Sequence, residues 1–128
     1  MSAYLWVSLG GALGACARFG VAQILPAGIS GSFPWPTFLV NALGALLIGL
    51  AIGWVGQSGW FSEYGRAFLV TGVLGGFTTF SAFSLEVVQL AQAGFVVQAV
   101  TYALVSLVVC AAFAALGLML GAALGVSS

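Results

Sequence analysis

Four long apolar stretches dominate the sequence and limit what it can fold into. They cover approximately residues 4–24, 36–55, 66–94 and 95–124, with Pro, Gly or Ser residues between them. A helix of about 20 residues is long enough to cross the roughly 30 Å hydrocarbon core of a bilayer. The pattern therefore predicts an all-α integral membrane protein with four transmembrane helices, which form a single domain over residues 1–128.

Charge is almost absent, which supports a membrane location and argues against several classes of function. Charged residues make up 3% of the chain, whereas an ordinary soluble domain has roughly a quarter. They are Arg18, Glu63, Arg66 and Glu86, and the chain has no lysine or histidine. A nucleic-acid surface, a histidine metal site and a catalytic acid pair all lack the side chains they need. We therefore expect neither an enzyme nor a nucleic-acid-binding protein.

The charges also give little information about orientation in the membrane. Lys and Arg in cytoplasmic loops normally set it, and here the loop residue Arg66 is offset by Glu63. Such a chain can insert both ways and pair as an antiparallel homodimer, although weaker cues setting one fixed orientation are the alternative. The polar residues need protection from lipid in either case, so we expect a homo-oligomer.

Glycines recur at four-residue spacing in every predicted helix. The rows are Gly10 with Gly14, Gly49 with Gly53, Gly72 with Gly76, and Gly117 with Gly121 and Gly125. Rows of small residues allow helix backbones to approach closely. They predict tight packing of helices, either within one subunit or between subunits.

Polar residues inside the predicted helices mark the candidate site. Asn41 lies well inside the second helix, where its short amide cannot reach water, and Thr37 lies one turn earlier on the same face. The fourth helix carries Tyr102, Ser106 and Cys110 at four-residue spacing, a stripe that also serves to bind helices together.

Two charged residues and two cysteines inside the helices have open roles. Arg18 is positioned either to reach the headgroups or to line a vestibule that attracts anions. Glu86 either extends to the interface or faces protein, water or an ion, because a carboxylate facing lipid costs about 2.5–3.5 kcal/mol. Cys16 and Cys110 fall in apolar runs, so we expect free thiols rather than a disulfide.

The segment GGFTTFSAFSLE, Gly75 to Glu86, is unusually polar for a transmembrane helix. Glycines weaken a helix and threonines compete for backbone hydrogen bonds, which predicts a break between Gly75 and Thr79. Such a break must be buried or line an aqueous cavity, and its free carbonyls can coordinate a cation. The alternative is a continuous helix in which the glycines only allow close packing.

This segment, with TFLVN ending at Asn41 and GGALGACARFG in the first helix, resembles the Fluc (CrcB) fluoride channels over the whole chain. The resemblance implies a dual-topology, antiparallel homodimer in the bacterial inner membrane. It also implies a fluoride-selective channel through which cytoplasmic fluoride leaves passively, lowering fluoride toxicity, and a structural sodium ion that is not transported.

The resemblance also assigns residues by motif position. Backbone carbonyls of Gly75 and Thr78 would hold the sodium ion, and Phe80 and Phe83 would line the fluoride pore. The remaining pore residues would be Asn41, Thr37, Thr79, Tyr102 and Ser106. Arg18, Glu86 and Cys110 would be vestibule or accessory residues, with Cys110, a weaker donor, where relatives often have serine.

Two other classes of membrane protein have a similar size. Small multidrug exporters also have four helices, but their resemblance rests on an acid in the first helix, where this chain has Arg18 and no acid. An accessory subunit without transport would need only the glycine rows. It would leave the combination of Asn41 and Phe80 unexplained.

Overall fold

The computed structural model of the protein describes residues 2–25, 28–55 and 63–126, and these residues contain four membrane-spanning segments. The first two spans are α1 (Ala3–Ile24) and α2 (Trp35–Val55). The third consists of α3 (Glu63–Arg66), the π-helix η1 (Ala67–Leu74), α4 (Gly75–Phe77) and α5 (Phe80–Gln92). The fourth is α6 (Val96–Val126). The predicted all-α fold with four spans is confirmed.

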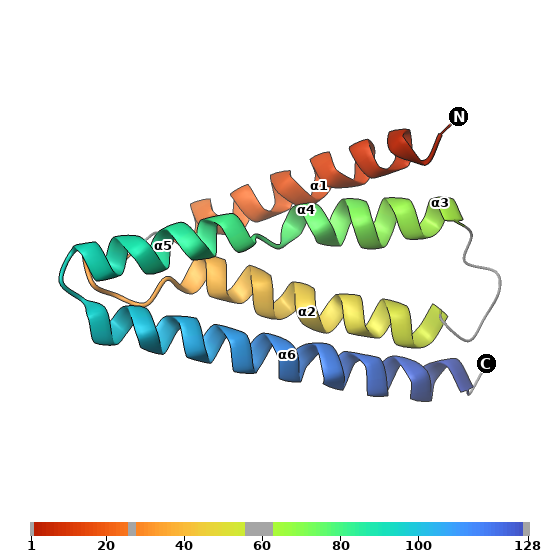
Figure 1. The fold of residues 1–128 in the computed structure, drawn as a ribbon. Helices are drawn as coiled ribbons and strands as arrows, with labels where there is room; N and C mark the ends of the chain where they lie inside the picture. The colour runs from red at the N-terminus through yellow and green to blue at the C-terminus, as the bar shows by residue number, and fades with distance from the viewer. Residues whose placement is uncertain (1, 26–27, 56–62, 127–128) are drawn as a thin grey trace.

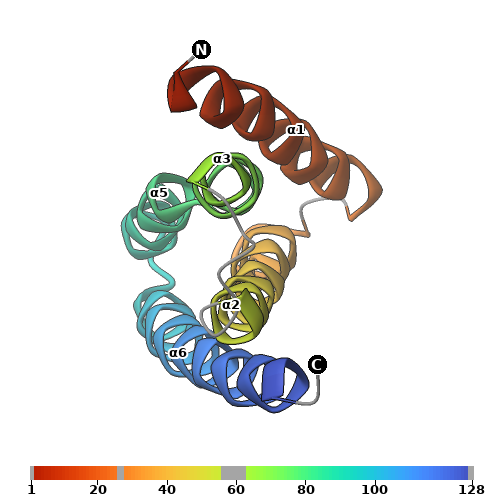
Figure 2. The same cartoon turned by 90° about the vertical axis from the view of Figure 1, so that its right-hand side faces the viewer.

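The spans pack as two pairs. In both views α1 lies beside the η1 and α4 part of the third span, and α2 lies beside α6 (Figures 1 and 2). Contacts between the two pairs are sparse except where α5 reaches α6. Because the chain crosses four times, α1 begins and α6 ends at the same end of the bundle (Figure 1).

Glycines bring the backbones of α2 and α6 into direct contact. A Cβ atom added at Gly49 would lie 2.4 Å from the Ala114 carbonyl oxygen, and one at Gly117 would lie 2.3 Å from the Leu46 oxygen. Both distances are far below van der Waals contact, so neither position has room for a side chain. One glycine row of α2 and one of α6 therefore pack against each other within a single chain.

The pair formed by α1 and the third span is joined in the same way. A Cβ at Gly14 would lie 2.0 Å from the Val73 oxygen, and one at Gly76 would lie 2.6 Å from the Gly11 oxygen. The glycine rows thus pack helices inside the subunit, which was one of the two possibilities that the sequence left open.

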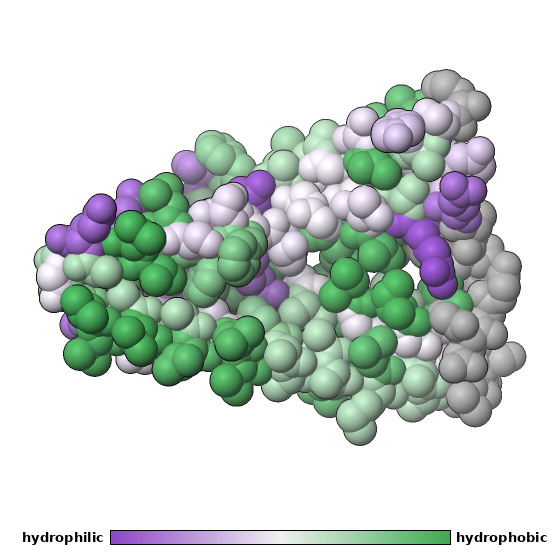
Figure 3. Space-filling view, in the orientation of Figure 1, coloured by the Kyte–Doolittle hydropathy of each residue, from purple (hydrophilic) through white to green (hydrophobic). Residues whose placement is uncertain are grey.

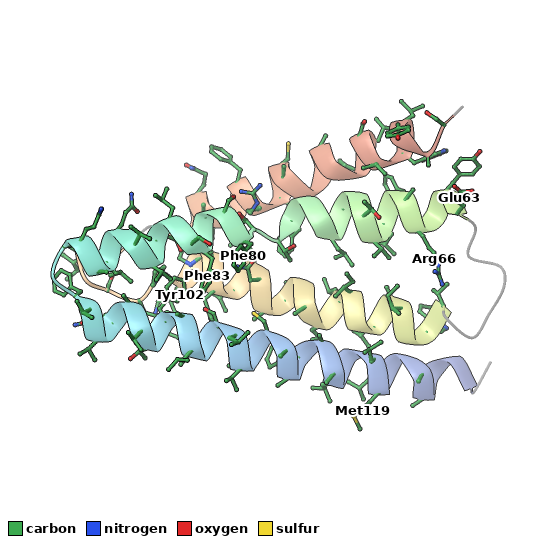
Figure 4. The ribbon with its side chains drawn as sticks, viewed as in Figure 1. Glu63, Arg66, Phe80, Phe83, Tyr102 and Met119 are labelled. Carbon is green, nitrogen blue, oxygen red and sulfur yellow. The ribbon has the colours of Figure 1, made fainter. Side chains whose placement is uncertain are left out.

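The outer surface is apolar, as a lipid-facing surface requires. Apolar side chains cover most of the visible face along α6, and hydrophilic residues gather toward the ends of the bundle and the middle of the third span (Figure 3). Met119 on α6 is 70% exposed and points away from the other helices (Figure 4). Together with the four spans, this surface makes the chain a multi-pass membrane protein.

The turn between the third and fourth spans has a specific glycine cap. Gly94 has φ +92°, in the left-handed region that favours glycine. Its N–H donates to the Ala91 oxygen at 3.1 Å, and that of Phe95 donates to the Leu90 oxygen at 2.9 Å. The third span therefore ends at Gln92, two residues earlier than the sequence predicted.

Candidate functional site

The third span breaks near its middle, at two threonines. Thr78 (φ −83°, ψ 157°) and Thr79 (φ −150°, ψ 117°) are extended, whereas Gly75 remains helical with φ −64° and ψ −37°. The break lies within the predicted segment, and the alternative of a continuous helix is wrong. The idea that the glycines themselves open the helix is also wrong, because Gly75 and Gly76 belong to α4.

The threonine side chains end one helix and begin the next. Both the N–H and the Oγ1 hydroxyl of Thr78 donate to the Leu74 oxygen at 3.0 Å, which closes the last turn of α4. Thr79 Oγ1 accepts from the Ala82 N–H at 3.1 Å and so caps the N-terminus of α5. Competition of threonine hydroxyls for backbone groups is the physical cause of the break.

Asn41 of α2 holds the open backbone from the side. Its Nδ2 donates to the Thr79 oxygen at 2.9 Å, and the Thr79 N–H donates to its Oδ1 at 2.7 Å. The amide oxygen therefore replaces the helical acceptor of the Thr79 N–H, and the amide nitrogen adds a donor to the Thr79 oxygen, which as the N-cap of α5 also accepts a helical bond. The second N–H of the Asn41 amide remains available as a donor.

Arg18 of α1 also bonds the backbone of the third span. Its Nε donates to the Gly76 oxygen at 3.2 Å, and the side chain is partly buried. The guanidinium therefore turns toward the break instead of extending to the end of α1. It lines neither of the two cavities described below.

Several carbonyls at the break lose their helical donors, and those of Gly75 and Thr78 are two of them. A continuous α-helix would pair the Gly75 oxygen with the Thr79 N–H, which instead donates to Asn41. It would pair the Thr78 oxygen with the Ala82 N–H, which instead donates to Thr79 Oγ1. Among the described residues, no side chain donates to either oxygen.

A cavity of about 390 Å³ opens beside the break, between the two helix pairs. The predicted sodium ligands Gly75 and Thr78 and the accessory residue Cys110 line it. The predicted pore residues that line it are Asn41, Thr79, Phe80, Phe83 and Ser106. The rings of Phe80 and Phe83 share a face of α5, with centroids 5.6 Å apart. Figure 4 places both rings near Tyr102, where α5 faces α6.

The polar groups of this cavity are donors without formal charge. None of the described residues that line it is charged. Ser106 is only 6% exposed, and its Oγ has no hydrogen-bond partner within the described part of the chain. Buried hydroxyls are nearly always paired, so this one indicates a place for a polar guest.

Glu86 is the centre of a second polar cluster. Its Oε1 accepts from the Thr37 hydroxyl at 2.6 Å, and its Oε2 accepts from the Tyr102 hydroxyl at 2.7 Å. The carboxylate therefore faces protein and does not extend to the interface. Thr37 and Glu86 line a second cavity of about 640 Å³, which the loop at residues 28–34 closes on one side.

An aromatic contact separates the two clusters. The Phe83 ring belongs to the first cavity, and its centroid is 5.1 Å from that of Tyr102, which is fully buried. The predicted polar stripe of α6 thus divides, with Ser106 and Cys110 at the first cavity and Tyr102 at Glu86.

Sequence reasoning missed several residues that shape the site. Phe33 and Phe38 pack edge to face, and Phe33 also packs on Tyr102 with centroids 5.2 Å apart. Gly44 makes room for the break, because a Cβ there would meet Thr78 Cγ2 at 2.1 Å. Its position one turn after Asn41 was a usable signal.

Comparison with known proteins places the chain in one family. The family described as CrcB-like protein, Camphor Resistance (CrcB), matches residues 5–118. The chain is 47% identical to a "Fluoride-specific ion channel FluC" of Thermus thermophilus, covering 97% of this chain and 98% of that protein. It is 45% identical to the protein of the same name from Novosphingobium aromaticivorans, covering 96% and 100%. The chain therefore belongs to the CrcB family.

Proposed function

We propose that this protein is a fluoride-selective channel that lets cytoplasmic fluoride leave the cell down its electrochemical gradient and so lowers fluoride toxicity. The observation that carries the proposal is the cavity beside the break, where phenyl rings and uncharged donors meet in mid-span. The relatives named as fluoride-specific channels support the same ion. Passage is passive, so no catalytic groups are needed.

The donors of the cavity suit a small anion that must also leave again. Phenyl rings carry positive potential at their edges, which Phe80 and Phe83 can present to fluoride. The free N–H of Asn41 and the unpaired Ser106 hydroxyl add hydrogen bonds. Several weak sites without a fixed positive charge replace hydration yet allow exit.

The path continues past the Phe83 ring to the second cluster. Thr79 and Ser106 line the first part, Thr37 and Glu86 line the second cavity, and the buried Tyr102 ring lies against Phe83 between them. Glu86 accepts the hydrogen bonds of the Thr37 and Tyr102 hydroxyls and so fixes the positions of both groups. Each hydroxyl has one O–H and donates it to Glu86, so the role of Glu86 in the proposal is to hold Thr37 and Tyr102 in place.

The ion selectivity is tested by efflux from liposomes that contain purified protein, with a fluoride electrode and a parallel chloride measurement. We expect fluoride release without comparable chloride release. Phe80→Ile and Phe83→Ile should reduce fluoride release by at least about tenfold, because Ile lacks the polarised ring edge. Phe19→Ile is the control, since Phe19 is 67% exposed on α1, away from the cavity. Comparable chloride flux, or wild-type flux from both ring variants, would contradict the proposal.

The functional unit in this proposal is an antiparallel dual-topology homodimer. Within one chain Phe80 is 79% exposed although it lies beside the polar break, and a second copy would cover it. Gly75 supports this, because a Cβ there would have only the Val70 oxygen near it, at 3.7 Å. Its missing side chain is not explained by packing inside the subunit.

The dimer is tested by Gly75→Ala, which fits a single subunit. A partner approaching this point would be displaced, so we expect cross-linking of the dimer in detergent to fall. Gly20→Ala is the matched control, because a Cβ at Gly20 has nothing within 4 Å. A Gly75→Ala protein that dimerises as well as the control would count against a partner here.

We also propose that the carbonyls of Gly75 and Thr78, which have lost their helical donors, hold a structural sodium ion with those of the partner. Bare carbonyls at a broken helix suit a monovalent cation. The described residues contain no group of three His, Cys, Asp or Glu that would favour another metal. Bound sodium would stabilise the break electrostatically. Replacing sodium with N-methylglucamine should lower the melting temperature of the dimer; an unchanged value would overturn this assignment.

A further inference from the structure

We propose that the Cys110 thiol is a binding site for soft, monofunctional heavy-metal electrophiles of the methylmercury class, and that their attachment blocks the cavity to anions. The blocking part rests on the proposed channel function. The binding part rests on the cavity alone and can be measured without transport.

The position of Cys110 exposes its thiol to the first cavity. It lies in the wall of the 390 Å³ cavity, opposite residues of α2 and α5 that include Asn41, Phe80 and Phe83. The thiol is free and only partly buried. A group bound to its sulfur therefore occupies space that an anion in this cavity has to cross.

The adjacent hydroxyl is an independent sign that the wall accepts a guest. Ser106 is one helical turn before Cys110 and lines the same cavity. Its side chain is buried, with 6% exposure, and its Oγ has no partner among the described residues. An unpaired buried hydroxyl costs free energy unless a bound molecule satisfies it.

The chemistry requires one thiol and no redox partner. Thiolate is a soft ligand that prefers soft metals. When methylmercury chloride binds, a sulfur–mercury bond forms, the mercury–chlorine bond breaks and chloride leaves, and the thiol proton goes to water. Mercury keeps its methyl group and oxidation state. Because methylmercury needs one further ligand, the absence of a three-ligand cluster in the described segments is no obstacle.

Cys16 provides an internal control for reactivity. It is exposed on α1 and lines neither cavity. We expect methylmercury to bind there as well, without any consequence for passage. Any loss of flux that survives Cys16→Ser must therefore come from Cys110.

The test uses full-length wild type, Cys16→Ser, Cys110→Ser and the double variant, each treated with methylmercury chloride. Intact mass should report one adduct per chain in Cys16→Ser and none in the double variant. Fluoride efflux, normalised to each untreated protein, should fall at least about tenfold in wild type and Cys16→Ser. It should not respond to the reagent in Cys110→Ser, and Cys110→Ala provides a second variant for the same comparison.

The mass measurement tests binding to the Cys110 thiol, and the efflux measurement tests the block of the cavity. No adduct on Cys16→Ser would overturn the binding site. An adduct that leaves efflux unchanged would overturn the block, as would inhibition that persists in both Cys110 variants. Absence of efflux from untreated wild type would contradict the channel function instead, and the mass measurement would still decide the thiol site.

Discussion

The contacts inside each helix pair differ from the contacts between the pairs. Inside the α2 and α6 pair, glycines place backbone on backbone, with no space for one added carbon at Gly49 or Gly117. Between the pairs, the link at the break is a side chain, Asn41 bonded to Thr79, and a cavity of about 390 Å³ remains. Direct backbone contact leaves no room for an ion, whereas side-chain links leave a lined space.

The two kinds of contact depend on different residues: glycines inside each pair, and polar or aromatic side chains between the pairs. Glycine contacts form a frame whose geometry hardly depends on side-chain rotamers. Hydrogen bonds and ring contacts then hold the break and the two cavities within that frame. Substitutions in the frame should act on folding, and substitutions between the pairs should act on the site with smaller effects on stability.

The largest effect is expected from Gly117→Val in the frame. Its Cβ would meet the Leu46 oxygen at 2.3 Å and the Leu50 nitrogen at 2.8 Å, and backbone atoms cannot move aside without separating the helices. We expect the free energy of unfolding to fall by about 3 kcal/mol. Unfolding by SDS in mixed micelles would measure it. Gly20→Val is the control, and equal losses in the two variants would remove the special role of the glycine contact.

Asn41→Leu tests the main link between the pairs. Leu keeps the branched shape of Asn, but it removes both bonds to the Thr79 backbone and leaves the Thr79 N–H without an acceptor. We expect a loss of about 2 kcal/mol in unfolding free energy, together with loss of fluoride efflux. Ser84→Ala is the control, because it removes a bond near the break that stays within α5. If both variants lose the same stability, the bonds of Asn41 do not hold the pairs together.

The frame was largely predictable from the sequence, because its signals are local. Runs of apolar residues and glycines at four-residue spacing report on span and packing through helix geometry alone. The pairing was not predictable, since Gly10 and Gly49 carry the same pattern and nothing in it identifies the helix that each contacts. Gly10 closely approaches Gly72 and Gly49 closely approaches Gly117, and only the packing of the helices in three dimensions determines these partners.

The site was predictable in its members and less so in its bonds. Competition by Thr78 and Thr79 for backbone groups placed the break within a few residues. The roles of Arg18 and Glu86 were left open, because their partners Gly76, Thr37 and Tyr102 lie far away in the sequence. Long-range hydrogen bonds depend on the packing of whole helices, and no local pattern encodes them.

Tyr102→Phe tests the second link between the pairs. It removes the 2.7 Å bond to Glu86 and keeps the ring that packs on Phe83 and Phe33. We expect a loss of about 1.5 kcal/mol in unfolding free energy, as for a hydrogen bond whose loss leaves a partly buried acceptor without a donor. Tyr4→Phe is the control, since Tyr4 is 82% exposed. A stability equal to that of the control would indicate that the ring alone joins α6 to α5.

The smallest effect is expected at the cap of α5. Thr79→Val keeps the β-branched shape but removes the oxygen that accepts from the Ala82 N–H at 3.1 Å. Loss of an N-cap costs about 1 kcal/mol, and the bonds of Asn41 to the Thr79 backbone remain to hold the break. Thr79→Ser should restore the cap and the stability, as measured by SDS unfolding. If Thr79→Val costs more than Asn41→Leu, the break is held by its own threonine and the link between the pairs is secondary.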